Sequence, residues 1–296
     1  MARLFDRRVK VILAVPSTED YHTISGNIHE ITDLRVQFKV EKNLSKEPNT
    51  AEISITNLSP RSRAEFQRKG VKVMLQAGYA DTLATIYVGD VRDTENRREG
   101  PDWTTKIQSG DSERAFRHAR VNESVKGGVK VPDLIRKLGD AAGLGIGNLE
   151  KQANLALAGR TVQHGYAVHG TASRELDRLL KAYNLEWSIQ DGQLQILAFG
   201  QGTDEPVVAI SPETGMIGSP EMSAPEKPAK PGSQSTAAAR GRVLKVKTLI
   251  QAINPGRRVV VKSLDHNGIM VAKKVSHSGD TTGGDWYTEL ELAETS

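Results

Sequence analysis

The alternation of apolar and polar side chains is the main pattern along this chain, and it predicts a series of short β-strands. Every second side chain is apolar in residues 31–40 and again in residues 51–55, and residues 9–15 are also typical of a strand. Ser59, a good helix cap, is followed by Pro60, which fits the first position of a helix. With further strands up to residue 112, the pattern predicts a first domain, over residues 1–112, of the β-barrel type with one short helix.

The last strand carries the clearest pattern. Trp286, Thr288, Leu290 and Leu292 fall on one face of residues 286–292, and polar side chains fall mostly on the other. The loop before it contains four residues that suit a tight turn: Asp280, Gly283, Gly284 and Asp285. Because glycine tolerates positive φ and aspartate bonds back to nearby amides, we expect a rigid loop that places Trp286 on the inner face.

This stretch has an echo earlier in the chain. Trp103 follows Asp102 as Trp286 follows Asp285, and the two tryptophans are 183 residues apart. A second matching pair, 186 residues apart, lies upstream: residues 70–76 and 256–262. Each copy has another expected strand in between, at residues 84–91 and 268–275. A tryptophan after a Gly-Asp turn is common by chance, but a match at two places favours duplication of one antiparallel β module.

Between the two copies the pattern changes. Apolar residues at helical spacing predict one helix from about residue 132 and a second one after Thr171, and Asp191–Gly192 is a strong hairpin signal. Residues 113–200 are therefore predicted to form a small α+β domain. The glycine-rich residues 143–147 follow a helix rather than a strand, so a helix stop is favoured over a phosphate-binding loop.

The remaining chain is predicted to complete the second copy. Residues 201–241 are rich in proline, glycine and serine, and residues 224–239 lack any apolar pattern, which predicts a mobile loop. Residues 242–296, completed by residues 201–220, are predicted to form the second β-barrel-type domain. The fold class is thus mainly β, with two similar domains flanking an α+β domain.

Composition narrows the classes of function. None of the apolar runs in the 296 residues approaches the ~20 residues that span a bilayer, and the start of the chain has no apolar signal segment, so we expect no membrane segment and assembly in the cytoplasm. There is no cysteine, which excludes disulfides and thiolate chemistry. The net charge of +4 is spread along the chain, which does not favour a sequence-specific nucleic-acid reader.

Candidate catalytic groups are weak. His164 and His169 have no nearby acidic partner, so we expect no metal and no cofactor. His277, between two serines and near Asp280, contains the residue types of a hydrolase triad, but triad members come from separate elements. We therefore expect no enzyme, and interpret one set of residues as structural or interface residues: Asn57, Asp102, Trp103, Asp280, Gly283, Gly284, Asp285 and Trp286.

Several segments resemble one protein family. Residues 277–291, which contain the GDTTGGDWYTE stretch, are the most specific, and the others are residues 46–59, 165–197, 211–221 and 249–256. These segments are similar to the baseplate hub proteins of tailed bacteriophages, a family also found in contractile injection systems.

The resemblance implies an architecture and a set of partners. Such hubs are homotrimers in which each subunit gives two β domains to a ring of pseudo-sixfold symmetry, which adapts the tail tube to a threefold spike or central fibre. The implied partners are the tail tube protein, the spike or fibre protein, other baseplate proteins and the tape measure protein, with DNA as a non-specific passenger in the channel of the virion. Two alternatives stay open: a tail-associated cell-wall hydrolase, and the hub of a tailocin or of a secretion-type injection machine.

Overall fold

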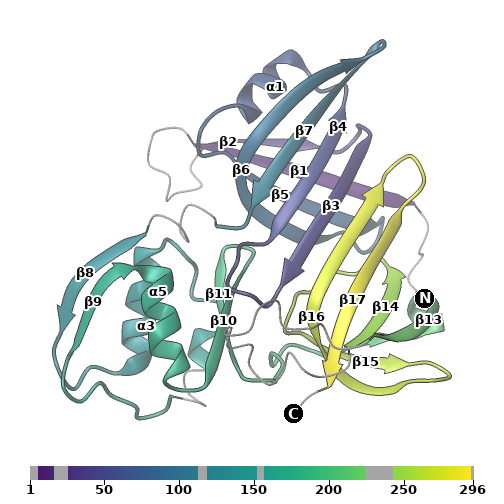
Figure 1. Cartoon of the computed structure of the whole chain (residues 1–296). Coiled ribbons are helices and arrows are strands. Elements are labelled where there is room, and N and C mark those ends of the chain that lie inside the picture. Colours follow the sequence, from purple (N-terminus) through teal and green to yellow (C-terminus); the bar gives the residue numbers. More distant parts are fainter. Residues whose placement is uncertain (1–5, 17–25, 113–118, 152–156, 224–242, 295–296) are drawn as a thin grey trace.

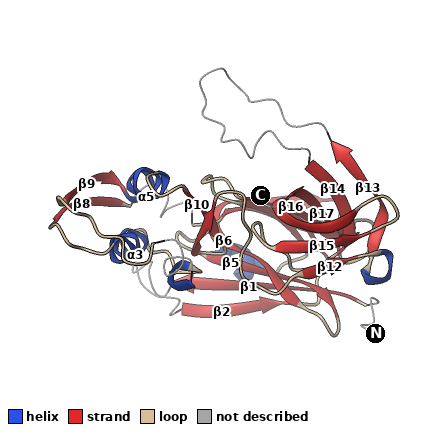
Figure 2. Cartoon of the chain, turned by 90° about the horizontal axis from the view of Figure 1, so that it is seen from below, coloured by secondary structure: helices blue, strands red, loops and turns tan. Residues whose placement is uncertain are grey.

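The computed structural model describes residues 6–16, 26–112, 119–151, 157–223 and 243–294 (Figure 1). The mobile loop expected at residues 224–239 lies outside these described residues. Two strand-rich modules lie against each other, and a smaller part with helices projects from their side, as Figure 2 also shows.

The first module contains strands at the period that the sequence predicts. Its elements are β1 (Arg7–Pro16), β2 (Gly26–Ile31), β3 (Val36–Asn43), β4 (Thr50–Thr56), α1 (Pro60–Phe66), β5 (Lys72–Tyr79), β6 (Ala84–Glu99) and β7 (Asp102–Gly110). The predicted cap of α1 is confirmed, because the amide of Ser62 donates to Ser59 Oγ at 3.1 Å and Pro60 occupies the first helical turn.

The middle part combines helices with two small sheets. Its elements are β8 (Arg120–Val125), α3 (Val131–Ala141), β9 (Tyr166–Thr171), α5 (Ala172–Lys181), β10 (Leu185–Gln190) and β11 (Gln193–Ala198). The apolar faces of α3 and α5 pack into one hydrophobic cluster with β10 and β11. The predicted hairpin is confirmed, with Asp191 at φ 55° and Gly192 at φ 79° in the turn between β10 and β11.

The second module follows. Its elements are β12 (Val208–Ile210), the 3₁₀ turn η1 (Pro212–Thr214), β13 (Met216–Ser223), β14 (Val243–Leu249), β15 (Arg258–Lys262), β16 (Asn267–Asp280) and β17 (Trp286–Glu294). The alternation of β17 is confirmed, because Trp286, Thr288, Leu290 and Leu292 are all buried.

The same strand order occurs twice in the chain. The order β3-β4-β7-β6-β5-β1 in the first module corresponds to β13-β14-β17-β16-β15-β12 in the second. Both separations read from the sequence agree with the pairing, since Lys72 lies opposite Asp90 as Arg258 lies opposite Val271. The predicted duplication is therefore confirmed at the level of strand order and register. One difference is that β12 runs parallel to β15, whereas β1 runs antiparallel to β5.

The two modules are not separate barrels. Residues 274–280 of β16 pair antiparallel with residues 37–43 of β3, which joins the modules in one 13-stranded sheet. The main path of pairing runs from β13 to β2 without closing, so among the described strands the expected barrel closure does not occur. The modules meet edge to edge because β16 is longer than β15, which leaves half of its outer edge for β3.

Candidate functional site

A continuous polar face covers eight neighbouring strands, in the order β13-β14-β17-β16-β3-β4-β7-β6. Residues directly opposite in a sheet share a face, and the register carries one row across the strands: Glu221, Lys245, Glu291, Lys274 and Asn43. The opposite face of the same strands holds the buried apolar side chains. The polar face is thus a single surface that both modules build.

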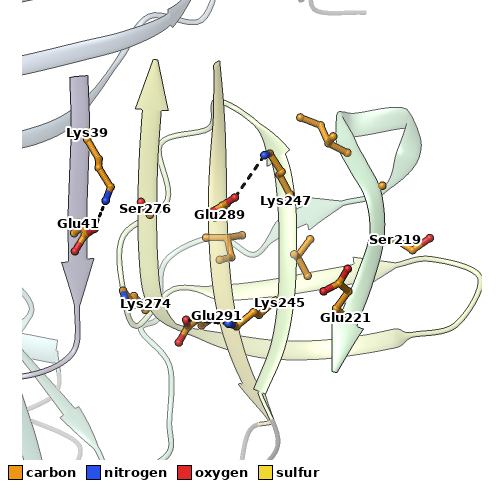
Figure 3. A pocket seen from close by; sticks show the side chains of 14 residues that line it. Lys39, Glu41, Ser219, Glu221, Lys245, Lys247, Lys274, Ser276, Glu289 and Glu291 are labelled. Carbon is orange, nitrogen blue, oxygen red and sulfur yellow. Dashed lines mark ion pairs between the residues drawn. The ribbon is translucent and has the colours of Figure 1, made fainter. Parts of the chain in front are cut away.

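Acidic and basic side chains alternate on this face and neutralise one another. Three cross-strand ion pairs lie on it: Lys106–Glu52 at 2.9 Å, Lys247–Glu289 at 3.5 Å and Lys245–Glu291 at 4.0 Å. Figure 3 shows part of this surface, with Lys39 and Glu41 paired at 2.8 Å on β3. The hydrogen bond from Lys39 lowers the pKa of Glu41, so both groups stay charged at neutral pH.

The joint between the modules is anchored by Trp286. Its side chain is 4% exposed and packs in the hydrophobic core of the first module rather than in that of its own. The rings of Phe38 and Tyr79 meet it edge-on, with centroids 5.8 Å and 6.3 Å away. The guanidinium of Arg7 lies 5.4 Å from the centre of its ring.

Asp280 ties the preceding loop to the first module. Its carboxylate accepts hydrogen bonds from Arg35 Nη2 at 2.7 Å and from Gln37 Nε2 at 2.9 Å. It also accepts from the amide and the hydroxyl of Thr282, each at 2.9 Å. Burial alone would raise the pKa of Asp280, but these donors outweigh it and hold the pKa well below the ordinary value.

The two glycines and Asp285 shape the loop itself. Gly283 and Gly284 have φ of 148° and 79°, which a side chain rarely adopts. The carbonyl of Gly284 accepts from Arg7 Nη1 at 3.2 Å, and the carbonyl of Asp285 accepts from the amide of Asp280 at 2.9 Å. The carboxylate of Asp285 is exposed. All five candidate residues of the second module therefore lie at the joint.

The three candidates of the first module form a corresponding cluster at the far end of β7. The side chain of Asn57 donates to Asp102 Oδ1 at 2.8 Å and accepts from the amide of Trp103 at 3.0 Å. Asn57 itself has φ 60°, in the left-handed region that asparagine tolerates. This cluster lies away from the joint, beside the free part of β6 (Figure 1).

Trp103 does not have the buried environment of Trp286. It lies on the same face of its strand as Thr105 and Ile107, but it is 37% exposed. Arg63 of α1 stacks on its ring at 4.2 Å from the centroid. The expectation that both tryptophans are core residues is wrong for Trp103, because the pocket for Trp286 is built by the other module and the described chain places no such module beside Trp103.

A second junction, which the sequence reasoning missed, buries a charged pair. Lys42 is 0% exposed, and its Nζ donates to both carboxylate oxygens of Asp191 at 2.6 Å and 2.7 Å. Asp191 also accepts from the amide of Val88 at 3.0 Å and from Asn254 Nδ2 at 3.2 Å. The β10–β11 turn of the middle part is thereby fixed to strands of both modules.

Asp111 completes this junction. Its carboxylate accepts from the amides of Asp191 and Gly192 at 2.6 Å and 2.8 Å. Burial, together with the nearby charge of Asp191, raises the pKa of Asp111 to about 6. The signal for this junction was present in the sequence, since Lys42 continues the inward phase of Val36, Phe38 and Val40.

The candidate triad does not form. His277 is buried, and its Nδ1 lies 2.9 Å from Thr288 Oγ1, whereas Ser276 and Ser278 lie at alternate positions on the polar face. Burial and the charge of Lys42 lower the pKa of His277 to about 3, so the ring is neutral. The described residues contain no group of three metal-ligating side chains, and no described helix is long and apolar enough to span a membrane.

The overall fold is similar to those of tail proteins. A 43 kDa tail protein of prophage MuSo2 from Shewanella oneidensis aligns over 97% of this chain and 98% of its own, with TM-score 0.63 and 10% identity. The tail protein from Neisseria meningitidis MC58 aligns over 98% of this chain and 97% of its own, with TM-score 0.62 and 12% identity.

A third similar structure comes from an injection system. An E. coli protein described as a component of the type VI secretion system, with structural similarity to T4 bacteriophage tail proteins gp27 and gp5, aligns over 89% of this chain and 74% of its own, with TM-score 0.56 and 12% identity. No protein-family model and no curated protein sequence matches the chain significantly. The chain therefore shares its fold with bacteriophage tail proteins and with a type VI secretion component.

Proposed function

We propose that this chain is a structural hub subunit of a tail baseplate, which forms a homotrimeric ring between the tail tube and the spike or central fibre. The similar folds of two tail proteins over nearly their whole length support a role in the tail. The ring and its adaptor role rest on the internal duplication. Three subunits with two similar modules each present six similar units, which matches a sixfold tube on one side and a threefold partner on the other.

The observation that carries this proposal is the joint between β16 and β3 inside the chain. It is a heterologous contact, since the edge offered by one module differs from the edge that receives it. Heterologous contacts that repeat with a fixed rotation close into rings. Because both modules have the same strand order, the joint inside the chain is a template for a second joint between chains.

The polar face forms the wall of the channel in this ring. A sheet that continues through its strand edges also continues its face, so the polar side of one chain joins that of the next. Attraction of DNA depends on basic groups that are free to neutralise phosphates. The lysines at 245, 247 and 106 are each paired with a glutamate, so DNA passes as a non-specific passenger.

The proposed partners follow from the position of the ring. They are the tail tube protein, the spike or central fibre protein, other baseplate proteins and the tape measure protein, within a virion that is assembled in the host cytoplasm. The fold of the E. coli secretion component favours one second candidate, the hub of a contractile injection machine. A cell-wall hydrolase is not favoured, because the candidate triad residues lie on opposite faces of β16.

The mass of the assembled protein tests this proposal. Native mass spectrometry and light scattering of the purified chain, alone and with its co-expressed spike protein, are expected to give a trimer. A chain that stays monomeric at every concentration, with and without that spike, overturns the ring.

A further inference from the structure

We propose that the ring closes by pairing β13 of one subunit, antiparallel, with residues 93–99 of β6 in the next subunit. The partner at both edges is a second copy of this chain. This inference rests on the proposed function and makes it specific, because it assigns the strands and the side chains of the contact between subunits.

The joint inside the chain supplies the template. There, residues 274–280 of β16 lie antiparallel to residues 37–43 of β3, with Ser278 opposite Lys39 and Ser276 opposite Glu41. The outer edge of β16 receives β3, and Trp286 of the neighbouring strand covers the inner side of the contact.

Residues 93–99 of β6 are the equivalent of residues 274–280 of β16. Ser278 lies opposite Tyr287 of β17 as Arg97 lies opposite Thr104 of β7, and Lys274 corresponds in the same way to Asp93. In both strands the register shifts just before this segment. None of the described strands pairs with the outer edge of β6 along residues 93–99.

β13 is the equivalent of β3. It pairs with β14 as β3 pairs with β4, so that Glu221, opposite Lys245, takes the place of Lys39, opposite Glu52. Figure 3 shows Glu221 on β13, at the end of the polar face. The other edge of β13 has no partner strand among the described residues.

Transferring the register of the joint to these strands places opposite charges together. Arg97 takes the place of Ser278 and Glu221 takes the place of Lys39, so the two lie directly opposite each other across the contact. Both are exposed in the single chain, and Arg97 reaches only Glu99 in its own strand, at 3.9 Å. Oppositely charged residues at facing positions stabilise antiparallel pairs.

The inner side of the contact is complementary as well. Trp103 takes the place of Trp286, and the inner side of β13 offers Met222, which is 41% exposed. Gly279 of the joint has no room for a side chain, because an added Cβ would lie 2.4 Å from the ring of Phe38. Its equivalent in β6 is Arg98, and β13 has Pro220 instead of an aromatic residue near the equivalent of Phe38. The larger residue on one edge is therefore matched by a smaller one on the other.

The absence of cysteine allows a direct crosslinking test. Arg97→Cys and Glu221→Cys are made separately and in one chain, and each protein is oxidised and run on a non-reducing gel. The double variant is expected to form covalent dimers and trimers. Each single variant is expected to stay monomeric on the gel, because the contact is heterologous, and a mixture of the two single variants is expected to give dimers. A trimeric double variant that does not crosslink contradicts the assigned register.

A charge reversal provides an independent readout. Arg97→Glu or Glu221→Arg alone is expected to raise the concentration of half-assembly at least about tenfold, because like charges then face each other at each contact. The combination is expected to restore assembly. Lys137→Glu, an exposed change on the middle part, serves as the control and should leave assembly unchanged.

The outcomes separate this inference from the proposed function. If the wild-type chain is trimeric but neither reversal weakens it, the assigned strands are wrong while the ring stands. If the wild-type chain does not assemble with or without its spike, the proposed function itself fails.

Discussion

The substitution Asp191→Asn tests whether the buried junction holds the middle part on the two modules. Asparagine has nearly the same shape as aspartate and tolerates the left-handed φ of 55° at this position, so the turn should persist. The loss of charge leaves Lys42, which is 0% exposed, without its carboxylate. Removing one partner of a buried ion pair costs about 3–5 kcal/mol, because the remaining charge is desolvated and unpaired.

The structure places this change near the upper part of that range. Asp191 accepts four hydrogen bonds, two from Lys42 Nζ and one each from the amide of Val88 and from Asn254 Nδ2. An amide oxygen accepts only some of them, and the amide nitrogen faces the ammonium group as a donor against a donor. Asn254 still donates or accepts in part, so we expect a loss of about 4 kcal/mol.

Urea unfolding at neutral pH, followed by circular dichroism, measures this loss. The matched control is Glu123→Gln, which removes an exposed ion pair with Lys137 and should cost no more than about 1 kcal/mol. Hydrogen exchange on the β10–β11 turn should rise in Asp191→Asn and not in the control. A loss under about 1 kcal/mol for Asp191→Asn would show that the junction does not depend on the charged pair.

Three further predictions concern the candidate residues and the polar face. Trp286→Ala should destabilise the chain by about 3–5 kcal/mol in thermal or urea unfolding, because it empties a pocket in the first module. Trp103→Ala, measured at a concentration where the chain is monomeric, should cost only about 1 kcal/mol, and an equal loss for both tryptophans would contradict their different burial. Since the pKa of Asp280 is lowered, its contribution is present above the unfolded pKa of about 3.9 and is lost as the pH falls below it, so Asp280→Asn should show a smaller fall in stability between pH 7 and pH 3 than the wild type. Glu289→Lys should bind a short DNA duplex several-fold more tightly at ~50 mM salt, by gel shift, because it leaves Lys247 unpaired; unchanged binding would argue that this face does not meet DNA.

Local pattern and repetition were readable from the sequence. The alternation of β17 and the turn at Asp191–Gly192 depend on neighbours in the chain, and both are as predicted. The duplication was readable because two segments matched at nearly the same separation, and a three-residue difference was expected from the loops between them. The eight candidate residues divide into one cluster at each of two equivalent places, as a duplicated module requires.

The joint between the modules was not readable. The pairing of β16 with β3 connects residues more than 230 positions apart, and nothing in the alternation of either strand names its partner. The same holds for the tryptophans, whose local sequences agree while their burial differs. Lys42 was overlooked because a lysine on an apolar face was not followed to the acidic group that it needs, and that group comes from another part of the chain.

The covalent link between the two modules has a consequence for how a ring of this kind meets its neighbours. A ring of six identical units would look the same after every sixty degrees, so a spike with three legs could seat in two equally good orientations. Here every other seam carries a buried aromatic anchor tethered within one polypeptide, and the seams between carry an arginine, a proline and a methionine instead. The tube can ignore this difference while the spike reads it, so the docking angle of the spike is set by the divergence of the two copies after duplication.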